Sequence, residues 1–206
     1  MTRHLSIAVL AGIVLLAASV AGCFPTEPRA AYECGSLLEP APSTDGPGFA
    51  TEDLGRNHVR DPNTVIRYKF CPPTSGEHFN IPNRGPIRPG LYPPTQEQVP
   101  GGWVHNMEHG YVVVLYRCPT GVFGDSDCIS EAEAAQLEAF FEDVPDSGNP
   151  ACPTKLVVAR FDSMATRFAV LAWDRAMLID EFDADAAEAF YVHWLDSANA
   201  PEPGLC

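Results

Sequence analysis

Runs of apolar residues predict a set of β-strands along the chain. They cover residues 65–70 (VIRYKF), 111–116 (YVVVLY), 155–160 (KLVVAR), 167–173 (RFAVLAW) and 176–179 (AMLI). The first of these alternates apolar with charged residues, which indicates a strand with one exposed face. The second has no polar face, which predicts a central strand covered on both sides. Because Asp174 and Arg175 form a tight connection, we expect the last two strands to form a hairpin.

Two further segments have the periodicity of amphipathic helices. Residues 130–144 begin with Ser130, followed three residues later by Glu133, which is a capping-box signature. Residues 184–198 follow Asp183, a favourable N-cap residue. The apolar faces consist of Leu137, Phe140, Phe141 and Val144 in the first segment and Phe190, Tyr191, Trp194 and Leu195 in the second. With the strands, these helices predict an α+β fold: a two-layer domain with a mainly antiparallel sheet and two helices.

Residues 82–102 do not fit this regular scheme. They contain so many Pro and Gly residues that we expect neither a helix nor a sheet there. Long irregular loops inside compact domains usually bind ligands or act as lids. This loop ends immediately before a histidine motif, so we expect it to border a functional site.

The first residues of the chain predict export. A basic start at Arg3 and an apolar stretch from Leu5 to Ala18 have the layout of a signal peptide over residues 1–22. The signal ends in Val-Ala-Gly before Cys23, a sequence that resembles a bacterial lipobox, so we expect Cys23 to carry a lipid. The alternative is an ordinary secreted protein in which this cysteine carries no lipid.

We therefore expect three regions in the chain. Residues 1–22 form a lipoprotein signal peptide, residues 23–50 the lipidated cysteine and a Pro-rich tether, and residues 51–206 a single globular α+β domain stabilised by disulfides. The N-terminal lipid would anchor this domain to a membrane of the bacterial cell envelope, outside the cytoplasm.

The charge of the chain excludes one class of partner. The signal peptide contains only Arg3 of the 13 basic residues and none of the 27 acidic residues, so its removal leaves a formal charge of −15. Such a charge repels phosphate backbones, and the sequence contains no basic stripe. We therefore expect no nucleic acid partner.

Six cysteines follow Cys23: Cys34, Cys71, Cys118, Cys128, Cys152 and Cys206. An even number in an exported chain predicts three disulfides, whose connectivity the sequence does not define. The pair Cys118 and Cys128 is favoured, because the segment between them is short and rich in turn-forming residues. No CxxC motif occurs, which argues against a thioredoxin-like redox site or a thiolate zinc knuckle.

The segment WVHNMEHGYVVVLY, residues 103–116, places His105 and His109 four residues apart. On a helix or on a strand, this spacing puts both imidazoles on one face. Read as HxxEH, the motif matches that of the inverzincin metalloproteases, which requires a long helix. The glycines at 101–102 and Gly110 leave little room for that helix, so we favour a strand.

On a strand, His105, Met107 and His109 share one face, and this set of nitrogen and thioether ligands suits copper. His78 and His58 are candidates for a third and a fourth ligand. The alternative for each histidine is a surface residue or a hydrogen-bonded residue of the core.

Two other residues near the histidines are candidates for catalysis. Glu108 is a candidate general base beside a bound metal, or an acceptor that orients an imidazole. Its alternative role is a hydrogen bond to the turn backbone. Ser75 is a candidate nucleophile, but no GxSxG motif surrounds it and Thr-Ser-Gly is a common turn sequence.

Several segments resemble, in order and spacing, a bacterial family of exported or membrane-anchored proteins known as domain of unknown function 3105. They are EDLGRNHV, PPTSGEH, VHNMEHGYVVVLY, LAWDR and PEP, within residues 51–203. The resemblance implies that the family pattern matches His58, Ser75, Gly76, His78, His105, Asn106, Glu108, His109 and Gly110. Position 107 is often aliphatic in such proteins, which weakens Met107 as a ligand. The resemblance implies a fold and a site more than a function.

Our hypothesis from the sequence is a membrane-anchored lipoprotein whose histidine cluster binds zinc or copper. His78, His105 and His109 would bind the ion, with His58 as a fourth ligand and Glu108 as orienting group or base. Two alternatives remain open. The first is a cell-envelope interaction protein with structural histidines, and the second is an envelope hydrolase that uses Glu108 or Ser75. Whether the protein is an enzyme also remains open.

Overall fold

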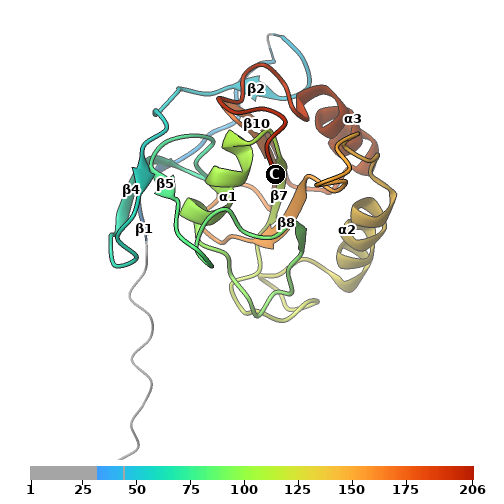
Figure 1. Ribbon diagram of the computed structural model, residues 1–206. Coiled ribbons are helices and arrows are strands. Elements are labelled where there is room, and N and C mark those ends of the chain that lie inside the picture. Colours follow the sequence, from blue (N-terminus) through green and yellow to red (C-terminus); the bar gives the residue numbers. More distant parts are fainter. Residues whose placement is uncertain (1–31, 44) are drawn as a thin grey trace, which may run out of the picture.

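The computed structural model describes residues 32–43 and 45–206. Its centre is a six-stranded mixed sheet (Figure 1). In spatial order, the strands are β2 (Phe49–Ala50), β10 (Arg175–Ile179), β9 (Phe168–Ala172), β7 (Val112–Tyr116), β8 (Leu156–Arg160) and β6 (Gly90–Leu91). The pairs from β2 to β7 are antiparallel, and β8 pairs in parallel with both β7 and β6. The predicted hairpin of β9 and β10 is confirmed.

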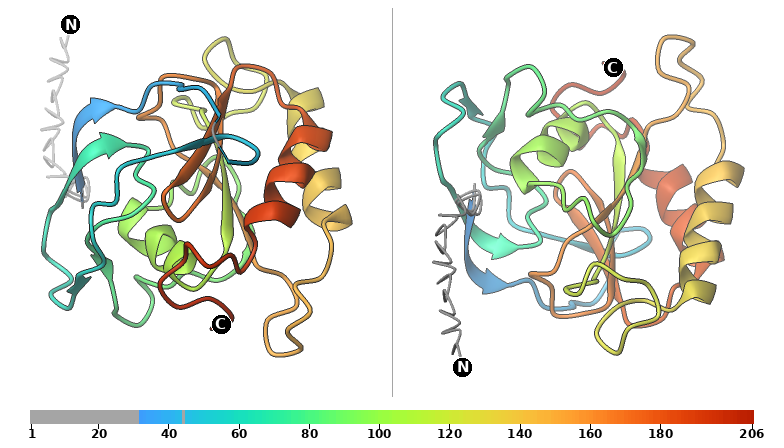
Figure 2. Two further views of the ribbon diagram at one scale, coloured as in Figure 1. Left: turned by 90° about the horizontal axis from the view of Figure 1, so that it is seen from above. Right: turned by 90° about the horizontal axis from the view of Figure 1, so that it is seen from below.

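Each face of this sheet is covered. Helices α2 (Glu131–Asp143) and α3 (Ala184–Trp194) lie on one face, and helix α1 (Pro100–Glu108) lies on the other with two small parallel sheets (Figure 2). The small sheets are β1 (Tyr32–Leu37) with β4 (Ile66–Cys71), and β3 (His58–Val59) with β5 (His78–Phe79). The α+β class is confirmed, and the structure adds a third helix to the two predicted.

Strand β7 is the central strand that the sequence predicted. All five of its residues are buried. Val113 and Leu115 belong to the apolar cluster beneath α1, whereas Val112, Val114 and Tyr116 belong to the cluster beneath α2 and α3. Alternate side chains of a strand point to opposite faces, so this unbroken apolar run serves both cores.

Helices α2 and α3 begin as predicted. The Ser130 hydroxyl accepts a hydrogen bond from the Glu133 backbone N–H, and the Glu133 carboxylate accepts one from the Ser130 backbone N–H. Asp183 accepts a hydrogen bond from the Ala186 backbone N–H. These caps satisfy backbone donors that have no partner inside the helix.

The segment that contains the histidine motif is a helix, so the predicted strand over residues 105–109 is wrong. Pro100 occupies the first turn of α1 and Gly110, with a φ of 86°, follows its end. Proline is favoured in the first turn of a helix, and glycine is favoured just after the last turn. A Cβ atom on Gly101 would lie 2.7 Å from the Phe79 ring, and one on Gly102 would lie 2.7 Å from the Arg84 carbonyl oxygen. The two glycines therefore permit a buried helix to pack closely on its neighbours.

The Pro- and Gly-rich loop is attached to α1. The Asn106 side chain accepts a hydrogen bond from the Ile87 backbone N–H at 2.9 Å and donates one to the Ile87 carbonyl oxygen at 2.8 Å. Asn106 is 1% exposed, so these two bonds satisfy a buried amide. The loop also contains β6 and the start of α1, which the sequence did not predict.

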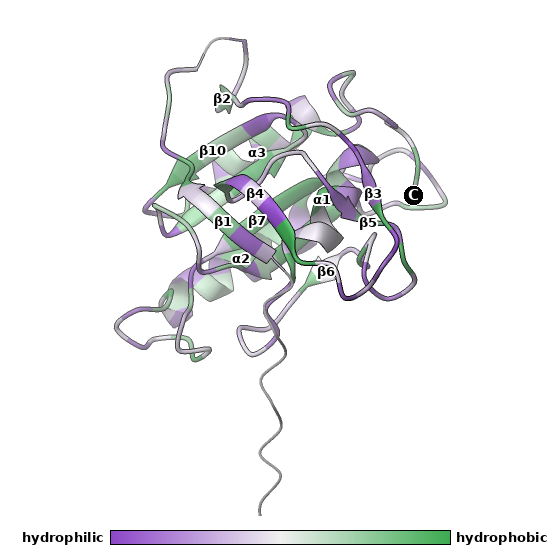
Figure 3. Cartoon of the chain, turned by 90° about the vertical axis from the view of Figure 1, so that its left-hand side faces the viewer, coloured by the Kyte–Doolittle hydropathy of each residue, from purple (hydrophilic) through white to green (hydrophobic). Residues whose placement is uncertain are grey.

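The folded domain begins earlier than residue 51. Strand β1 pairs with β4, and β2 pairs with β10, although both lie in the segment predicted to be a tether. A disulfide joins Cys34 of β1 to Cys71 of β4. Figure 3 shows β1 and β4 as a largely polar outer layer over the apolar strands of the central sheet. The predicted signal peptide and Cys23 lie outside the described residues.

Two further disulfides close the fold. They join Cys118 to Cys128, the pair that the short intervening segment favoured, and Cys152 to Cys206. The second bond fixes the C-terminal tail, as does Asp196, which accepts hydrogen bonds from the buried Lys155 ammonium and the Gly204 backbone N–H. Within the described residues, no helix has the length and apolar character that crossing a bilayer requires.

Candidate metal centre

The first two histidines of the site lie side by side on paired strands. β3 and β5 are parallel, and His58 is the direct partner of His78 in their register. Backbone hydrogen bonds from His78 to Asn57, at 3.1 Å, and from Asn80 to Val59, at 3.1 Å, extend this short pairing. Partnered residues of a ladder point to the same face. The two imidazole centroids are therefore only 4.8 Å apart.

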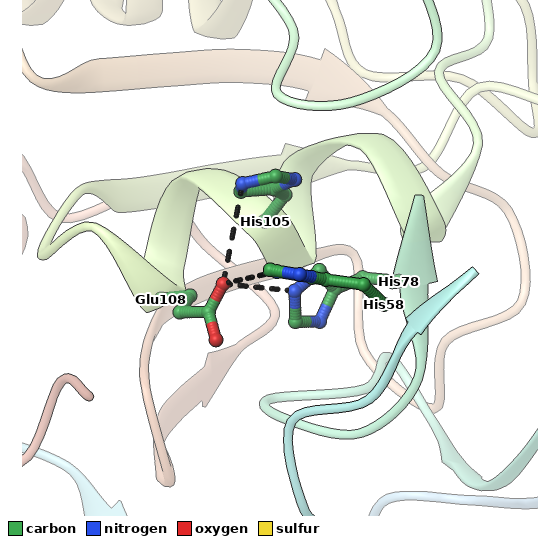
Figure 4. Close-up of side chains that lie close together, drawn as sticks. All are labelled: His58, His78, His105 and Glu108. Atoms are coloured by element: carbon green, nitrogen blue, oxygen red, sulfur yellow. Dashed lines mark hydrogen bonds and ion pairs between the residues drawn. The ribbon is translucent and has the colours of Figure 1, made fainter. Parts of the chain in front are cut away.

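Helix α1 supplies the other two groups. His105 and Glu108 are three residues apart on the helix, which places both side chains on one face. This face lies against β5, and Figure 4 shows both side chains turned toward His58 and His78. The His105 ring lies 5.1 Å from the His58 ring and 5.0 Å from the His78 ring, centroid to centroid.

One oxygen atom lies at the centre of the three imidazoles. Oε2 of Glu108 lies 2.9 Å from Nε2 of His78, 3.0 Å from Nε2 of His58 and 4.0 Å from Nε2 of His105 (Figure 4). The four residues each offer one ligand atom, and all four atoms lie within 4.8 Å of one another. The sequence had treated Glu108 as an orienting group or base, whereas the structure places it among the candidate ligands.

Main-chain carbonyls fix the orientation of two of the rings. Nδ1 of His78 donates to the Gly76 carbonyl oxygen at 2.8 Å, and Nδ1 of His105 donates to the Phe79 carbonyl oxygen at 2.6 Å. A carbonyl oxygen only accepts, so each Nδ1 carries a hydrogen. In a neutral ring, Nε2 then carries a lone pair, and in both residues this atom faces the centre of the cluster.

The pKa values of both His105 and Glu108 lie below their usual values. Burial lowers the pKa of His105 to about 4, although its bond to the Phe79 carbonyl opposes the change. Burial alone would raise the pKa of Glu108, but hydrogen bonds from His58 and His78 and their charges hold that pKa below its usual value. At neutral pH the centre therefore combines a neutral His105 with an ionised carboxylate.

The cluster reaches solvent at His58. Its side chain is 29% exposed, whereas those of His78, His105 and Glu108 are 3% exposed or less. Nδ1 of His58 lies 3.3 Å from the side-chain nitrogen of Asn80, which donates to it. With Nδ1 as acceptor, a neutral His58 carries its hydrogen on Nε2, so binding of a metal there would require the tautomer with the hydrogen on Nδ1. No main-chain carbonyl holds that nitrogen in the described structure, so His58 is less constrained than the other two rings.

His109, a predicted ligand, belongs to an adjoining group. Its Nε2 lies 3.6 Å from Oε2 of Glu202, and Glu108, His109 and Glu202 offer ligand atoms within 4.8 Å of one another. The His109 ring contacts the His105 ring edge-on, with 4.7 Å between centroids. Burial lowers the pKa of His109, and the charges of Glu202 and Glu108 oppose that change.

Two predicted residues lie away from the centre. Met107 is fully buried in the apolar cluster beneath α1, because on a helix it points away from the face that His105 and Glu108 share. The Ser75 hydroxyl accepts a hydrogen bond from the Leu54 backbone N–H at 3.0 Å. It also lies 3.4 Å from the Glu52 carbonyl oxygen, to which it donates.

Sequence reasoning missed Glu202. It is in the PEP segment near the C-terminus, far in the sequence from His58, His78, His105 and His109. Its backbone N–H donates to the Glu108 carbonyl oxygen at 2.9 Å, which brings it to the end of α1. An acidic residue beside a proline carries no signal of this contact, so only the tertiary fold reveals it.

A family model with the description "Protein of unknown function (DUF3105)" matches residues 58–206. The match includes His58, at its start, and all the other residues of the cluster. No curated protein and no solved structure matches the chain.

Proposed function

Because the chain belongs to the DUF3105 family, whose function is unknown, we propose a function from the site itself: His58, His78, His105 and Glu108 bind a divalent transition metal, with zinc as the best fit. We propose further that the protein is a lipoprotein of the bacterial cell envelope, anchored through Cys23. Three disulfides support an address outside the reducing cytoplasm.

The observation that carries the proposal is the direction of the Nε2 atoms. Hydrogen bonds to carbonyls hold the hydrogens of His78 and His105 on Nδ1, so the two Nε2 lone pairs of the neutral rings face a carboxylate oxygen. Lone pairs and a carboxylate repel one another unless a cation lies between them, and that cation is either a proton, as in the hydrogen bond from His78 to Glu108, or a metal ion. Backbone carbonyls that bind the second nitrogen of an imidazole are a usual feature of metal-binding histidines.

The spacing of the cluster fits a small ion. Ligands at about 2.0 to 2.1 Å from a tetrahedral zinc ion lie about 3.3 Å from one another. The distances from Glu108 Oε2 to the three Nε2 atoms are 2.9, 3.0 and 4.0 Å, which bracket this value. The longest of these distances, to His105, would have to shorten by about 0.7 Å to reach the tetrahedral spacing.

The ligand chemistry favours zinc over copper in this proposal. The case for copper rested on the thioether of Met107, which lies in the apolar core. Three imidazole nitrogens and one carboxylate oxygen are a common set for zinc and other divalent first-row ions. With four protein ligands a tetrahedral ion has no open position, so a bound ion would act as a Lewis acid only if it accepted a fifth ligand, which would enter from solvent past His58, the exposed member of the set.

Metal content tests the proposal. We expect the purified protein, stripped with a chelator and dialysed against Zn²⁺, to retain at least one ion per chain and to melt at a higher temperature than the stripped form. His78→Ala and Glu108→Gln should lose this ion. His193→Ala is the matched control, since His193 is exposed on α3 and lies outside the cluster.

Two results would contradict the proposal. The first is wild-type protein that retains less than about half an equivalent under these conditions. The second is unchanged metal content in both variants, with His105→Ala lowering stability only. That pattern would support the interaction protein with structural histidines.

A further inference from the structure

The cluster continues beyond the four proposed ligands. His109 follows α1 directly and Glu202 lies on the C-terminal tail, and each offers a ligand atom within 4.8 Å of one from Glu108. Glu108 therefore belongs to two groups: one with three histidines, and one with His109 and Glu202. A carboxylate has two oxygens, so it is able to bind two ions at once.

The geometry between His109 and Glu202 suits a second ion. Nε2 of His109 and Oε2 of Glu202 are 3.6 Å apart, which is too long for a hydrogen bond. Two ligands about 2.1 Å from one ion lie roughly 3.0 to 3.6 Å apart for bond angles of about 90° to 120°. The observed distance is at the upper end of this range.

One nitrogen of the His109 ring is buried without a hydrogen bond of normal geometry, although the Cys206 main chain lies close to the ring. The His109 side chain is 11% exposed, and its buried Nδ1 has no hydrogen bond in the described structure. Buried polar atoms without a partner are costly and call for an explanation. An ion would bind at Nε2, the other ring nitrogen, and would place the hydrogen on Nδ1, so it would not itself satisfy Nδ1.

The fold holds Glu202 in this position. Its backbone N–H donates to the Glu108 carbonyl oxygen at 2.9 Å. Two residues later, the Gly204 N–H donates to Asp196 at 2.8 Å, and the chain then ends in the disulfide of Cys206. The tail is therefore fixed on both sides of Glu202, although the Glu202 side chain remains 40% exposed and able to adjust.

The carboxylates of Glu108 and Glu202 are not neutralised by a nearby Lys or Arg side chain in the described structure. The buried Lys155 ammonium donates to the His109 carbonyl oxygen at 2.9 Å and is paired with Asp196. Its positive charge is thus balanced locally. Glu108 and Glu202 have no Lys or Arg partner among the ion pairs of the described residues.

We propose that Glu108 bridges two divalent metal ions, one bound by His58, His78 and His105 and the other by His109 and Glu202. This inference rests on the proposed function of the first site and adds a second position to it. In known two-metal sites, the ions lie about 3.5 to 4 Å apart and share such bridging groups.

Native mass spectrometry of the full-length protein, stripped and reloaded with Zn²⁺, counts the ions. We expect two per chain in the wild type and one in Glu202→Gln and His109→Ala. Glu142→Gln, which changes an exposed glutamate of α2, is the matched control and should retain two. With Co²⁺ as the probe, electron paramagnetic resonance should show magnetic coupling in the wild type that disappears in Glu202→Gln.

The outcomes separate the two proposals. One ion in the wild type that is lost in His78→Ala but kept in Glu202→Gln would overturn the two-metal inference and leave the proposed function intact. Two ions in both the wild type and Glu202→Gln would also overturn it, because the second ion would then lie elsewhere. No ion in the wild type would overturn the proposed function, and the two-metal inference with it.

Discussion

At the scale of single residues, the site depends on which nitrogen of each imidazole carries the hydrogen. The carbonyl oxygens of Gly76 and Phe79 decide this for His78 and His105. Gly76 adopts a φ of 113°, a conformation that other residues rarely adopt, and its carbonyl binds the imidazole two residues later. The backbone of the PTSGEH segment thus orients a side chain of the same segment.

Asp174 gives a prediction about pH at this scale. Burial raises the pKa of Asp174 to about 6 and nearby Asp53 also raises it, whereas Ser75 and Arg175 lower it. A carboxyl group with a raised pKa in the folded state stabilises the fold when protonated. That contribution is complete below the pKa of the unfolded chain, near 4, and is lost as the pH rises through about 6.

Asp174→Asn should therefore stabilise the stripped protein at pH 7.5 by up to about 2 kcal/mol, and much less at pH 4. Asparagine tolerates the φ of 54° at this position of the β9–β10 hairpin. Urea denaturation of both proteins at the two pH values measures the difference. An equal effect at both values would contradict a raised pKa for Asp174 in the folded state.

At the scale of elements, the sequence predicted the parts whose signals are local. The capping box at Ser130, the N-cap at Asp183 and the apolar run of β7 all appear where expected. Helix α1 was missed because the glycines at 101–102 lower helix propensity, and the reason for them is the approach of Phe79 and other distant residues.

The pairing of β3 with β5 was also outside the reach of sequence patterns. Each strand is two residues long, and they are joined in parallel across a separation that contains β4. No alternation is visible in so short a strand. The sequence proposed His58 and His78 as candidate ligands but did not indicate that they are neighbours, which follows from this pairing.

Gly101→Ala tests the account of α1. In an exposed helix this change would stabilise the protein, because alanine has a higher helix propensity than glycine. Here the new Cβ would lie 2.7 Å from Phe79 and 2.9 Å from Ile66, so we expect a loss of about 1 to 3 kcal/mol. Gly90→Ala is the control, since a Cβ there meets no atom within 4 Å. Equal thermal stability of the two variants would contradict the account.

At the scale of the whole molecule, the site is assembled from segments that the sequence keeps far apart. β3, β5 and α1 contribute the histidines, and the C-terminal tail contributes Glu202 (Figure 2). Disulfides hold two outer parts of this assembly, β1 on β4 and the tail on residue 152. A site fixed in this way needs little rearrangement to receive an ion, which favours tight binding.

The central claim is that three imidazoles converge on the Glu108 carboxylate to bind one ion. Anomalous diffraction at the zinc edge, from crystals of the Zn²⁺-loaded protein, tests this most directly. We predict a peak about 2.0 to 2.1 Å from Nε2 of His58, His78 and His105, and within binding distance of Glu108. A loaded crystal with no peak between these residues would contradict the account.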